Sequence, residues 1–248
     1  MRFRCIEHGA VDSTSERAFA ALTDGTARHG DVHFATSQSA GRGRRGRSWW
    51  SPPGEGLYAS LVLLPPPPPW NPVGLTMAGG LAVLDAARAC GLLGARLDWP
   101  NDLVAGDSKL AGVLVETKGF VPETPHYVVG LGLNVGQREF PAELRRERAV
   151  ASLRSLGLLV SVEEAREAVL LSLASRLEQM EGNVDALAAD YLLGTGLRDR
   201  RVRVRFGDQE CLGKLDDLTV AGGVALSEID GKARSFPLEI VRELVPCL

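Results

Sequence analysis

The sequence predicts an α+β protein, in which a mixed β-sheet with packed helices is followed by a small β-barrel. Segments with strand and helix patterns alternate through residue 196 without a repeat. Two of them, 56–64 and 126–135, are apolar on both faces, which is typical of central strands covered on both sides. From residue 201 onward only short strand-like runs occur, enough for a small barrel. We therefore expect two domains, 1–196 and 197–248.

Two capping boxes indicate where helices begin. Ser13 should accept a free backbone N–H while Glu16 reaches back, so that a helix runs from there to about Thr26. Ser161 and Glu164 repeat the pattern. The helix that follows them has an apolar stripe formed by Val162, Ala165, Val169, Leu173, Leu177 and Met180.

Apolar alternation and turn residues predict the other elements. These are strands at 31–36, 56–64, 95–99 and 126–135, a hairpin at 103–117, helices at 73–91 and 184–193, and loops at 38–56 and 136–149. Gly106 and Asp107 supply the hairpin turn, and Gly91 caps the first of these helices. Pro65–Pro69 should end the second strand because proline offers no N–H to a sheet, and we expect a stiff loop there rather than a ligand for an adaptor groove.

Composition and charge restrict the class of protein. The 248 residues are 45% hydrophobic and 24% charged, so the chain can bury a core without disulfide bonds or metal ions to stabilise it. A net charge of −3 gives no global reason to expect nucleic acid or an anionic membrane as partner. We see neither a signal peptide nor an apolar stretch near the roughly 20 residues of a membrane helix. The four cysteines lack C-x-x-C spacing, so we expect buried thiols in a reducing cytoplasm.

The segment 38–50 is rich in glycine and arginine. Only four of the 28 basic residues are lysines, yet four arginines fall together at Arg42, Arg44, Arg45 and Arg47. Glycine lets the backbone approach a ligand closely, and guanidinium groups bind anionic oxygens through paired hydrogen bonds. The segment lacks the G-K-[ST] ending of a Walker loop. A solvated basic loop or an RNA contact is the alternative, although the flanking apolar strands and two tryptophans disfavour a disordered tail.

Three further polar positions interrupt apolar strands. Lys109 begins such a strand, where its ammonium either meets a carboxylate or phosphate in a cleft or lies at a strand edge in water. Asn101 and Asp102 either hold Mg²⁺ through oxygen atoms or form a turn. Asn134, at the end of a glycine-containing strand, is either a turn former or a ligand contact. The four histidines lack metal-ligand spacing, and we expect structural roles for them.

Together these pieces resemble biotin–protein ligases, which biotinylate acetyl-CoA carboxylase and related carboxylases. The matching motifs, in the family's order and spacing, are Asp12-Ser13-Thr14, Gln38 with Gly41-Arg42-Gly43-Arg44-Arg45-Gly46-Arg47 and Trp49, Trp99-Pro100-Asn101-Asp102, Lys109-Leu110-Ala111-Gly112 and Gly130-Leu131-Gly132-Leu133-Asn134-Val135. The resemblance covers nearly the whole chain. It implies a catalytic domain like that of class II aminoacyl-tRNA synthetases and an SH3-like barrel after it. Since a strand should begin near residue 3, we expect the DNA-binding domain of the bifunctional members to be absent.

The resemblance implies a reaction in two steps. Biotin and MgATP give biotinyl-5′-adenylate and pyrophosphate, and the activated carboxyl then passes to one lysine of a carrier protein. ATP and Mg²⁺ are thus co-substrate and metal, biotin is the substrate, and no prosthetic group is implied. The implied catalytic residues are Lys109 and Arg44. The implied biotin site comprises Ser13, Thr14, Ser15, Gln38, Arg42, Gly43, Arg44 and Lys109. The implied ATP and adenylate site comprises Arg42, Arg44, Arg45, Trp49, Asn101, Lys109 and Asn134, with Asn101 and Asp102 as candidate metal ligands.

Two residues depart from the family's pattern. Asp98 stands where the family usually has lysine, which changes the charge beside the site by two. Ser15 stands where the family usually has asparagine, which removes an amide from the implied biotin pocket. Both departures bear on affinity, metal handling or carrier recognition.

Other functions remain compatible with these residues. One is a lipoate or octanoate ligase or transferase on the same fold, although the Gly-Arg repeat with Trp49 favours biotin. Another is an RNA-binding module working through residues 42–47. The expected partner is the biotin carboxyl carrier protein of acetyl-CoA carboxylase or a related carboxylase. We expect neither DNA nor a membrane as partner, and a homodimer is left open.

Overall fold

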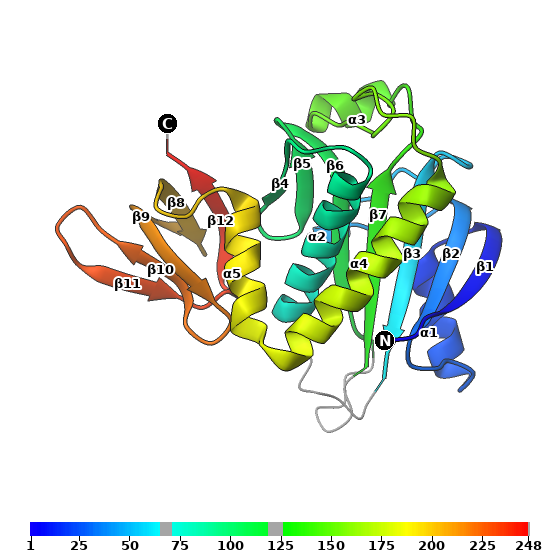
Figure 1. Cartoon of the computed structure of the whole chain (residues 1–248), viewed down its shortest axis with the longest axis horizontal. Coiled ribbons are helices and arrows are strands. Elements are labelled where there is room, and N and C mark those ends of the chain that lie inside the picture. The colour runs from blue at the N-terminus through cyan, green and yellow to red at the C-terminus, as the bar shows by residue number, and fades with distance from the viewer. Residues whose placement is uncertain (65–70, 119–125, 248) are drawn as a thin grey trace.

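A seven-stranded sheet forms the larger part of the molecule (Figure 1). The computed structural model describes residues 1–64, 71–118 and 126–247. Within them the strands run in the order β1-β2-β3-β7-β6-β5-β4. Their bounds are β1 (Arg4–Val11), β2 (Asp31–Gln38), β3 (Gly56–Leu63), β4 (Ala95–Asp98), β5 (Asp102–Ala105), β6 (Ser108–Glu116) and β7 (Tyr127–Asn134). β1 and β2 pair in parallel and the other neighbours are antiparallel, which confirms the expected mixed sheet.

Helices cover both faces of this sheet (Figure 1). On one face lies α1 (Thr14–Thr23), whose Phe19 packs on Val62 and Val128. On the other lie α2 (Pro72–Ala89), α4 (Val162–Gly182) and α5 (Val184–Thr195), which form the main core with side chains such as Leu61. Successive side chains of a strand point to opposite faces. All eight residues of β3 are therefore buried, as its apolar pattern on both faces predicted.

Of the two predicted capping boxes, one is confirmed and one is wrong. At the start of α4, Ser161 accepts the Glu164 backbone N–H and Glu164 accepts that of Ser161. At α1, Ser13 occupies the cap position but its side chain makes no capping bond. The Glu16 carboxylate turns instead to two cationic side chains, which form stronger hydrogen bonds than one backbone N–H does. The helix also ends earlier than expected, at Thr23.

Other local predictions fail in part. The loop expected at 136–149 contains a short helix, α3 (Ala142–Glu147), because this segment after Pro141 consists of strong helix formers. The cysteines were expected to be buried, but Cys5 on the edge strand is exposed and Cys90 and Cys247 are half-buried. Pro65–Pro69 lies outside the described residues.

The C-terminal segment forms a second, five-stranded antiparallel sheet in the order β11-β10-β9-β8-β12. Its strands are β8 (Arg201–Phe206), β9 (Gln209–Thr219), β10 (Gly223–Ser227), β11 (Ala233–Phe236) and β12 (Val241–Pro246). Gly196, with a φ of 68° that favours glycine, ends α5 just before this sheet. Trp99 donates its indole N–H to the Val241 carbonyl over 3.0 Å and so ties the two sheets together. None of the described helices is long and apolar enough to cross a membrane.

Candidate active site

Two adjacent glycines, Gly112 and Gly132, leave a flat surface without side chains at the centre of the sheet, on the face that α1 partly covers. We call this surface the glycine floor. Gly112 of β6 and Gly132 of β7 are directly paired, and Trp49 lies against both. A Cβ atom at Gly132 would lie 2.5 Å from Cε2 of Trp49, and one at Gly112 would lie 3.2 Å from its Cζ3. Gly132 of the Gly-Leu-Gly-Leu-Asn motif and Gly112 of the Lys-Leu-Ala-Gly motif thus make room on the sheet for a flat ring.

The Gly-Arg loop brings Trp49 to this floor. Its two arms are bridged, because Gly43 donates to the Arg47 carbonyl over 2.7 Å and Trp49 donates to the Gly41 carbonyl over 2.8 Å. A single 3₁₀ turn, Arg44–Gly46, forms the tip. A Cβ at Gly41 would lie 2.5 Å from the Trp49 carbonyl oxygen, so this glycine is required by the close approach of the two arms.

Lys109 lies under the indole of Trp49. Its Nζ is 5.3 Å from the ring centroid and forms an ion pair of 2.8 Å with Oδ1 of Asp102. Burial lowers the pKa of the Lys109 ammonium, and the Asp102 carboxylate opposes this shift. Lys109 is therefore packed rather than lying at a strand edge in water, and the carboxylate that it meets is the protein's own Asp102. Its contact with a ligand stays a prediction. The ammonium is held between an aromatic face and an anion.

A cluster of hydroxyl and amide groups lines the same face beside the N-terminus of α1. Gln38 accepts from the Thr14 backbone N–H over 2.9 Å and from its hydroxyl over 3.2 Å. The Ser60 hydroxyl lies 2.8 Å from that of Thr14 and 3.1 Å from that of Ser15. Ser60 is fully buried in β3 and joins these groups, yet the sequence analysis missed it. Its signal was a small serine hydroxyl in a largely apolar strand, which indicates a buried hydrogen-bond partner. Ser13 adjoins the cluster and is 1% exposed.

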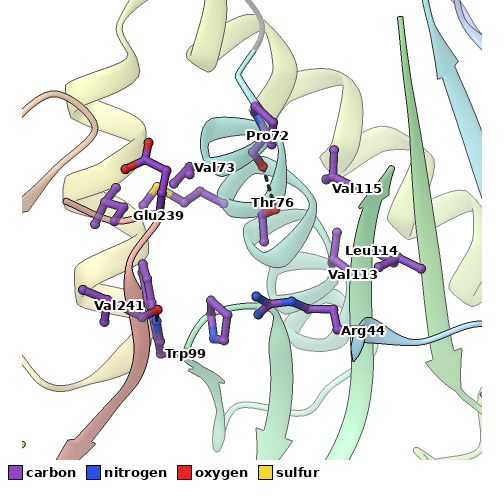
Figure 2. A pocket seen from close by; sticks show the side chains of 13 residues that line it. Arg44, Pro72, Val73, Thr76, Trp99, Val113, Leu114, Val115, Glu239 and Val241 are labelled. Atoms are coloured by element: carbon purple, nitrogen blue, oxygen red, sulfur yellow. Dashed lines mark hydrogen bonds between the residues drawn. The ribbon is translucent and has the colours of Figure 1, made fainter. Parts of the chain in front are cut away.

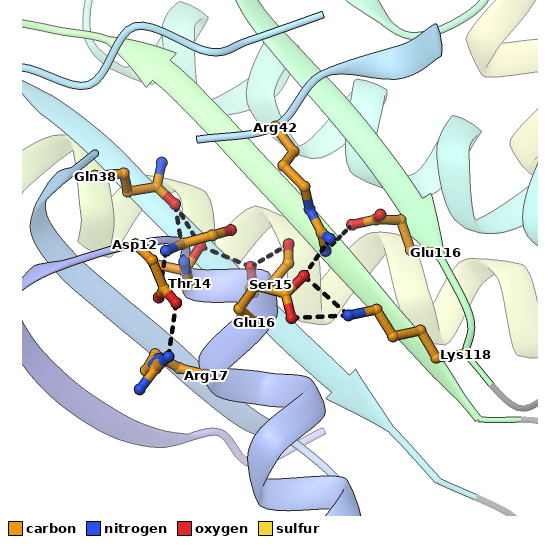
Figure 3. A network of polar contacts seen from close by, with 11 residues as sticks. Asp12, Thr14, Ser15, Glu16, Arg17, Gln38, Arg42, Glu116 and Lys118 are labelled. Atoms are coloured by element: carbon orange, nitrogen blue, oxygen red, sulfur yellow. Dashed lines mark hydrogen bonds and ion pairs between the residues drawn. The ribbon is translucent and has the colours of Figure 1, made fainter. Parts of the chain in front are cut away.

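Arg42 is engaged by carboxylates (Figure 3). Its guanidinium lies between Glu16 of α1 and Glu116 of β6, with its Nη2 2.9 Å from the Glu116 carboxylate. Lys118 reaches the other side of Glu16 over 2.7 Å and lowers the pKa of that carboxyl. Both cations also approach the ring of Phe19. The sequence predicted an anionic partner for Arg42, and the structure shows two glutamates beside it.

Two cavities adjoin the Gly-Arg loop. One, of about 450 Å³, is an open cleft lined by residues 42–47 together with Leu114 and Glu116. The other, of about 260 Å³, lies between the edge of β6, the start of α2 and the segment before β12 (Figure 2). Arg44 enters the second cavity from the side opposite Trp99 and Val241. The first is walled by the predicted anion-binding residues. The second is mostly apolar.

The two predicted asparagines support backbone in this structure. Asn134 donates to the Ala151 carbonyl over 2.9 Å, and Asn101 donates to the Val113 carbonyl over 2.9 Å. The side-chain oxygen of Asn101 accepts a hydrogen bond from the Arg44 guanidinium over 3.1 Å.

The residues proposed as metal ligands do not form a metal site as they lie. Both carboxylate oxygens of Asp102 face cations, Lys109 on one side and Arg148 on the other. No group of three His, Cys, Asp or Glu side chains that could hold a metal occurs in the described ranges. The assignment of Asn101 and Asp102 as ligands stays a prediction.

The structure thus brings most of the predicted residues together in three groups on one region of the sheet. These groups are Ser13, Thr14, Ser15 and Gln38, then Trp49, Lys109 and Asp102, and then Arg44 with Asn101. Some predicted residues lie outside these groups. The Asn134 side chain binds the Ala151 carbonyl, Gly43 lies in the bridged arm of the Gly-Arg loop, and Arg45 is exposed at the tip of that loop.

Comparisons with known proteins agree with this geometry. Residues 9–134 match the biotin/lipoate A/B protein ligase family. The chain is 31% identical over 220 residues to the bifunctional ligase/repressor BirA of Salmonella typhimurium, covering 88% of this chain and 68% of that protein. It is 34% identical over 222 residues to the biotin–[acetyl-CoA-carboxylase] ligase of Mycobacterium tuberculosis, covering 86% and 79%. The structure of the Aquifex aeolicus biotin protein ligase in complex with biotin and ATP is similar with a TM-score of 0.81 and 28% identity, covering 98% and 99%.

Proposed function

The chain belongs to the biotin/lipoate A/B protein ligase family, and on that premise we propose that it is an ATP-dependent biotin ligase acting on a carboxylase carrier protein. The observation that carries the proposal is the position of Lys109 beneath Trp49, on the glycine floor and on the same face as the hydroxyl cluster of Thr14 and Ser15. An apolar ring system bearing a carboxylate fits such a site.

The reaction follows from the charges involved. A biotin carboxylate oxygen attacks the α-phosphorus of ATP, the bond to the β,γ-unit breaks, and pyrophosphate leaves. Two anions must approach each other, so fixed cations are required at their meeting point. The carrier lysine amine then attacks the carbonyl of the mixed anhydride, and AMP leaves. Holding the reactants in register can lower the barrier by up to roughly 7–11 kcal/mol.

The residues are assigned by their position. Ser13, Thr14, Ser15 and Gln38 bind the polar end of biotin, because the hydroxyl and amide groups of the last three converge on one corner and the buried Ser13 adjoins them in the chain. Lys109 and Arg44 act between the carboxylate and the α-phosphate, with Arg42 and Gly43 on the carboxylate side. On the adenylate side we place Arg45, Trp49, Asn101 and Asn134. The bridged Gly-Arg loop shields the anhydride from water while the carrier docks.

Several finer features belong to the same proposal. We assign residues 1–196 to a catalytic domain of the class II aminoacyl-tRNA synthetase type and residues 197–248 to an SH3-like barrel, a division supported by the two separate sheets and the turn at Gly196. Four free cysteines, none in a disulfide among the described residues, support a cytoplasmic location. The pairing of Arg42 with Glu16 and Glu116 reduces the positive charge available to a polyanion, which disfavours RNA.

One assay tests the proposed function. The purified chain is incubated with biotin, MgATP and a carrier domain of acetyl-CoA carboxylase, and biotin attachment is read by avidin blot and intact mass. We expect attachment that requires ATP and is lost when the target lysine of the carrier is replaced by arginine. Parallel reactions with lipoate and octanoate should give none. Transfer of lipoate in preference to biotin, or no transfer with either, contradicts the proposal.

A further inference from the structure

Two carboxylates face each other at the base of the site. Asp98 and Asp102 are directly opposite in the antiparallel pair β4–β5. Like charges at directly opposite positions destabilise a β-ladder. Asp102 also holds Lys109, the residue to which we assigned the reacting anions. The pair therefore places an excess negative charge close to where two further anions must bind.

Arg148 resolves this repulsion. Its guanidinium spans the pair, contacting Asp102 at one end and Oδ2 of Asp98 at the other over 2.9 Å. Arg96 approaches Oδ1 of Asp98 at 3.6 Å. The row formed by Lys109, Asp102, Arg148 and Asp98 alternates in charge. These side chains are 11–31% exposed, so solvent screens them only in part.

The backbone fixes Arg148 relative to Lys109. The segment that follows Arg148 pairs with Lys109 on both sides: Lys109 donates to the Ala149 carbonyl and Ala151 donates to the Lys109 carbonyl, each over 2.9 Å. Asn134 in turn binds the Ala151 carbonyl. The backbone contacts that hold Lys109 thus also place Arg148 beside the two aspartates.

We propose that Arg148 is a positioning residue for the reaction: by bridging Asp98 and Asp102 it leaves Lys109 with a single carboxylate partner and so keeps its ammonium directed at the incoming anions. Without Arg148, Asp98 keeps its longer ion pair with Arg96 (3.6 Å), both carboxylates draw more strongly on Lys109, and the site carries one positive charge fewer. This also explains how the chain accommodates Asp98 beside the site, since the compensating cation comes from a segment 50 residues further along. The inference rests on the proposed function.

The test compares four variants in steady-state turnover with an excess of carrier domain, measured as biotin-dependent pyrophosphate release. Arg148→Gln should lower kcat at least 10-fold and raise the KM for ATP. Arg148→Lys should recover most of the loss, because it restores the charge. Asp98→Asn in the Arg148→Gln background should recover several-fold, because it removes the competing carboxylate. Arg146→Gln, an exposed arginine of α3, is the control for loss of one positive charge and should match the wild type.

Three results would overturn the proposal. One is an Arg148→Gln variant with kcat and KM within twofold of the wild type. Another is an Arg148→Gln/Asp98→Asn variant no more active than Arg148→Gln alone. The third is an equal loss in Arg148→Lys and Arg148→Gln, since a residue needed only for folding would show that. The melting temperature of each variant separates misfolding from mispositioning.

Failure of the proposed function gives a different result. A wild-type chain that releases no pyrophosphate with biotin refutes that function, and with it the role of Arg148 in the reaction. In that case the melting temperatures of the wild type, Asp98→Asn, Arg148→Gln and the double variant still form a double-mutant cycle. This cycle measures the coupling between the two side chains without any substrate.

Discussion

Replacing Gly132 by alanine should displace Trp49. The new Cβ would lie 2.5, 2.8 and 2.9 Å from three atoms of the indole, whereas carbon atoms in contact are separated by about 3.5–4.0 Å. The ring must therefore retreat by about 1 Å, or the strand must shift. Insertions of this size into packed sites cost about 1–3 kcal/mol. For a protein of this length each kcal/mol corresponds to a decrease of roughly 2–4 °C in Tm.

Gly130 supplies a matched control on the same strand and the same face. A Cβ there meets its nearest atoms at 3.4 Å (the Leu114 carbonyl oxygen) and 3.5 Å (the Ser15 hydroxyl), which is close to ordinary contact. Gly130→Ala should therefore cost less than Gly132→Ala. Calorimetry gives Tm, and tryptophan fluorescence reports the environment of the indole. In a Trp49→Ala background the difference between the two alanine variants should largely vanish. Equal Tm values and unchanged fluorescence in the two single variants would refute the steric argument.

Three further outcomes are expected. Lys109→Gln should slow pyrophosphate release by roughly 100-fold with little change in Tm, because it removes a fixed charge aimed at the reacting anions; a rate near wild type would exclude this role. Ser60→Ala should raise the KM for biotin more than it lowers kcat, because the hydroxyls of Thr14 and Ser15 lose their shared partner, and isothermal titration with biotin checks this directly. Burial lowers the pKa of His33 to about 4, below the 6.5 of an exposed histidine, so folding stability should decrease as pH falls from 6.5 towards 4. Urea midpoints across this range should change less in His33→Gln, and equal slopes would contradict the assignment.

Local patterns predicted the elements well wherever hydrogen bonds and side-chain alternation act within one segment. The buried β3, the hairpin turning at Gly106 and the capping box at Ser161 all depend on residues a few positions apart, and all are found. The box at Ser13 has the same local pattern but fails, because the Glu16 side chain has stronger partners brought by other elements. A local pattern thus predicts a bond only where no distant charge competes for the same group.

The sequence also predicted most of the candidate site, since the Gly-Arg segment, Lys109 and the glycine-containing strand indicate an anion-binding site from their residue types alone. It could not assign partners. Arg42 was expected to contact a ligand, and the structure also pairs it with two glutamates. Ser60 was not singled out, although it links two predicted residues.

The arginine cluster, the glycine strands and Lys109 are therefore properties of the sequence by itself. The tertiary structure alone decided that Trp49 lies on Gly132 and that Arg148 bridges Asp98 and Asp102. The reason is physical: a strand or a cap is determined by bonds between neighbours along the chain, whereas an ion pair across 46 or 50 residues forms only once the sheet has fixed where both backbones lie.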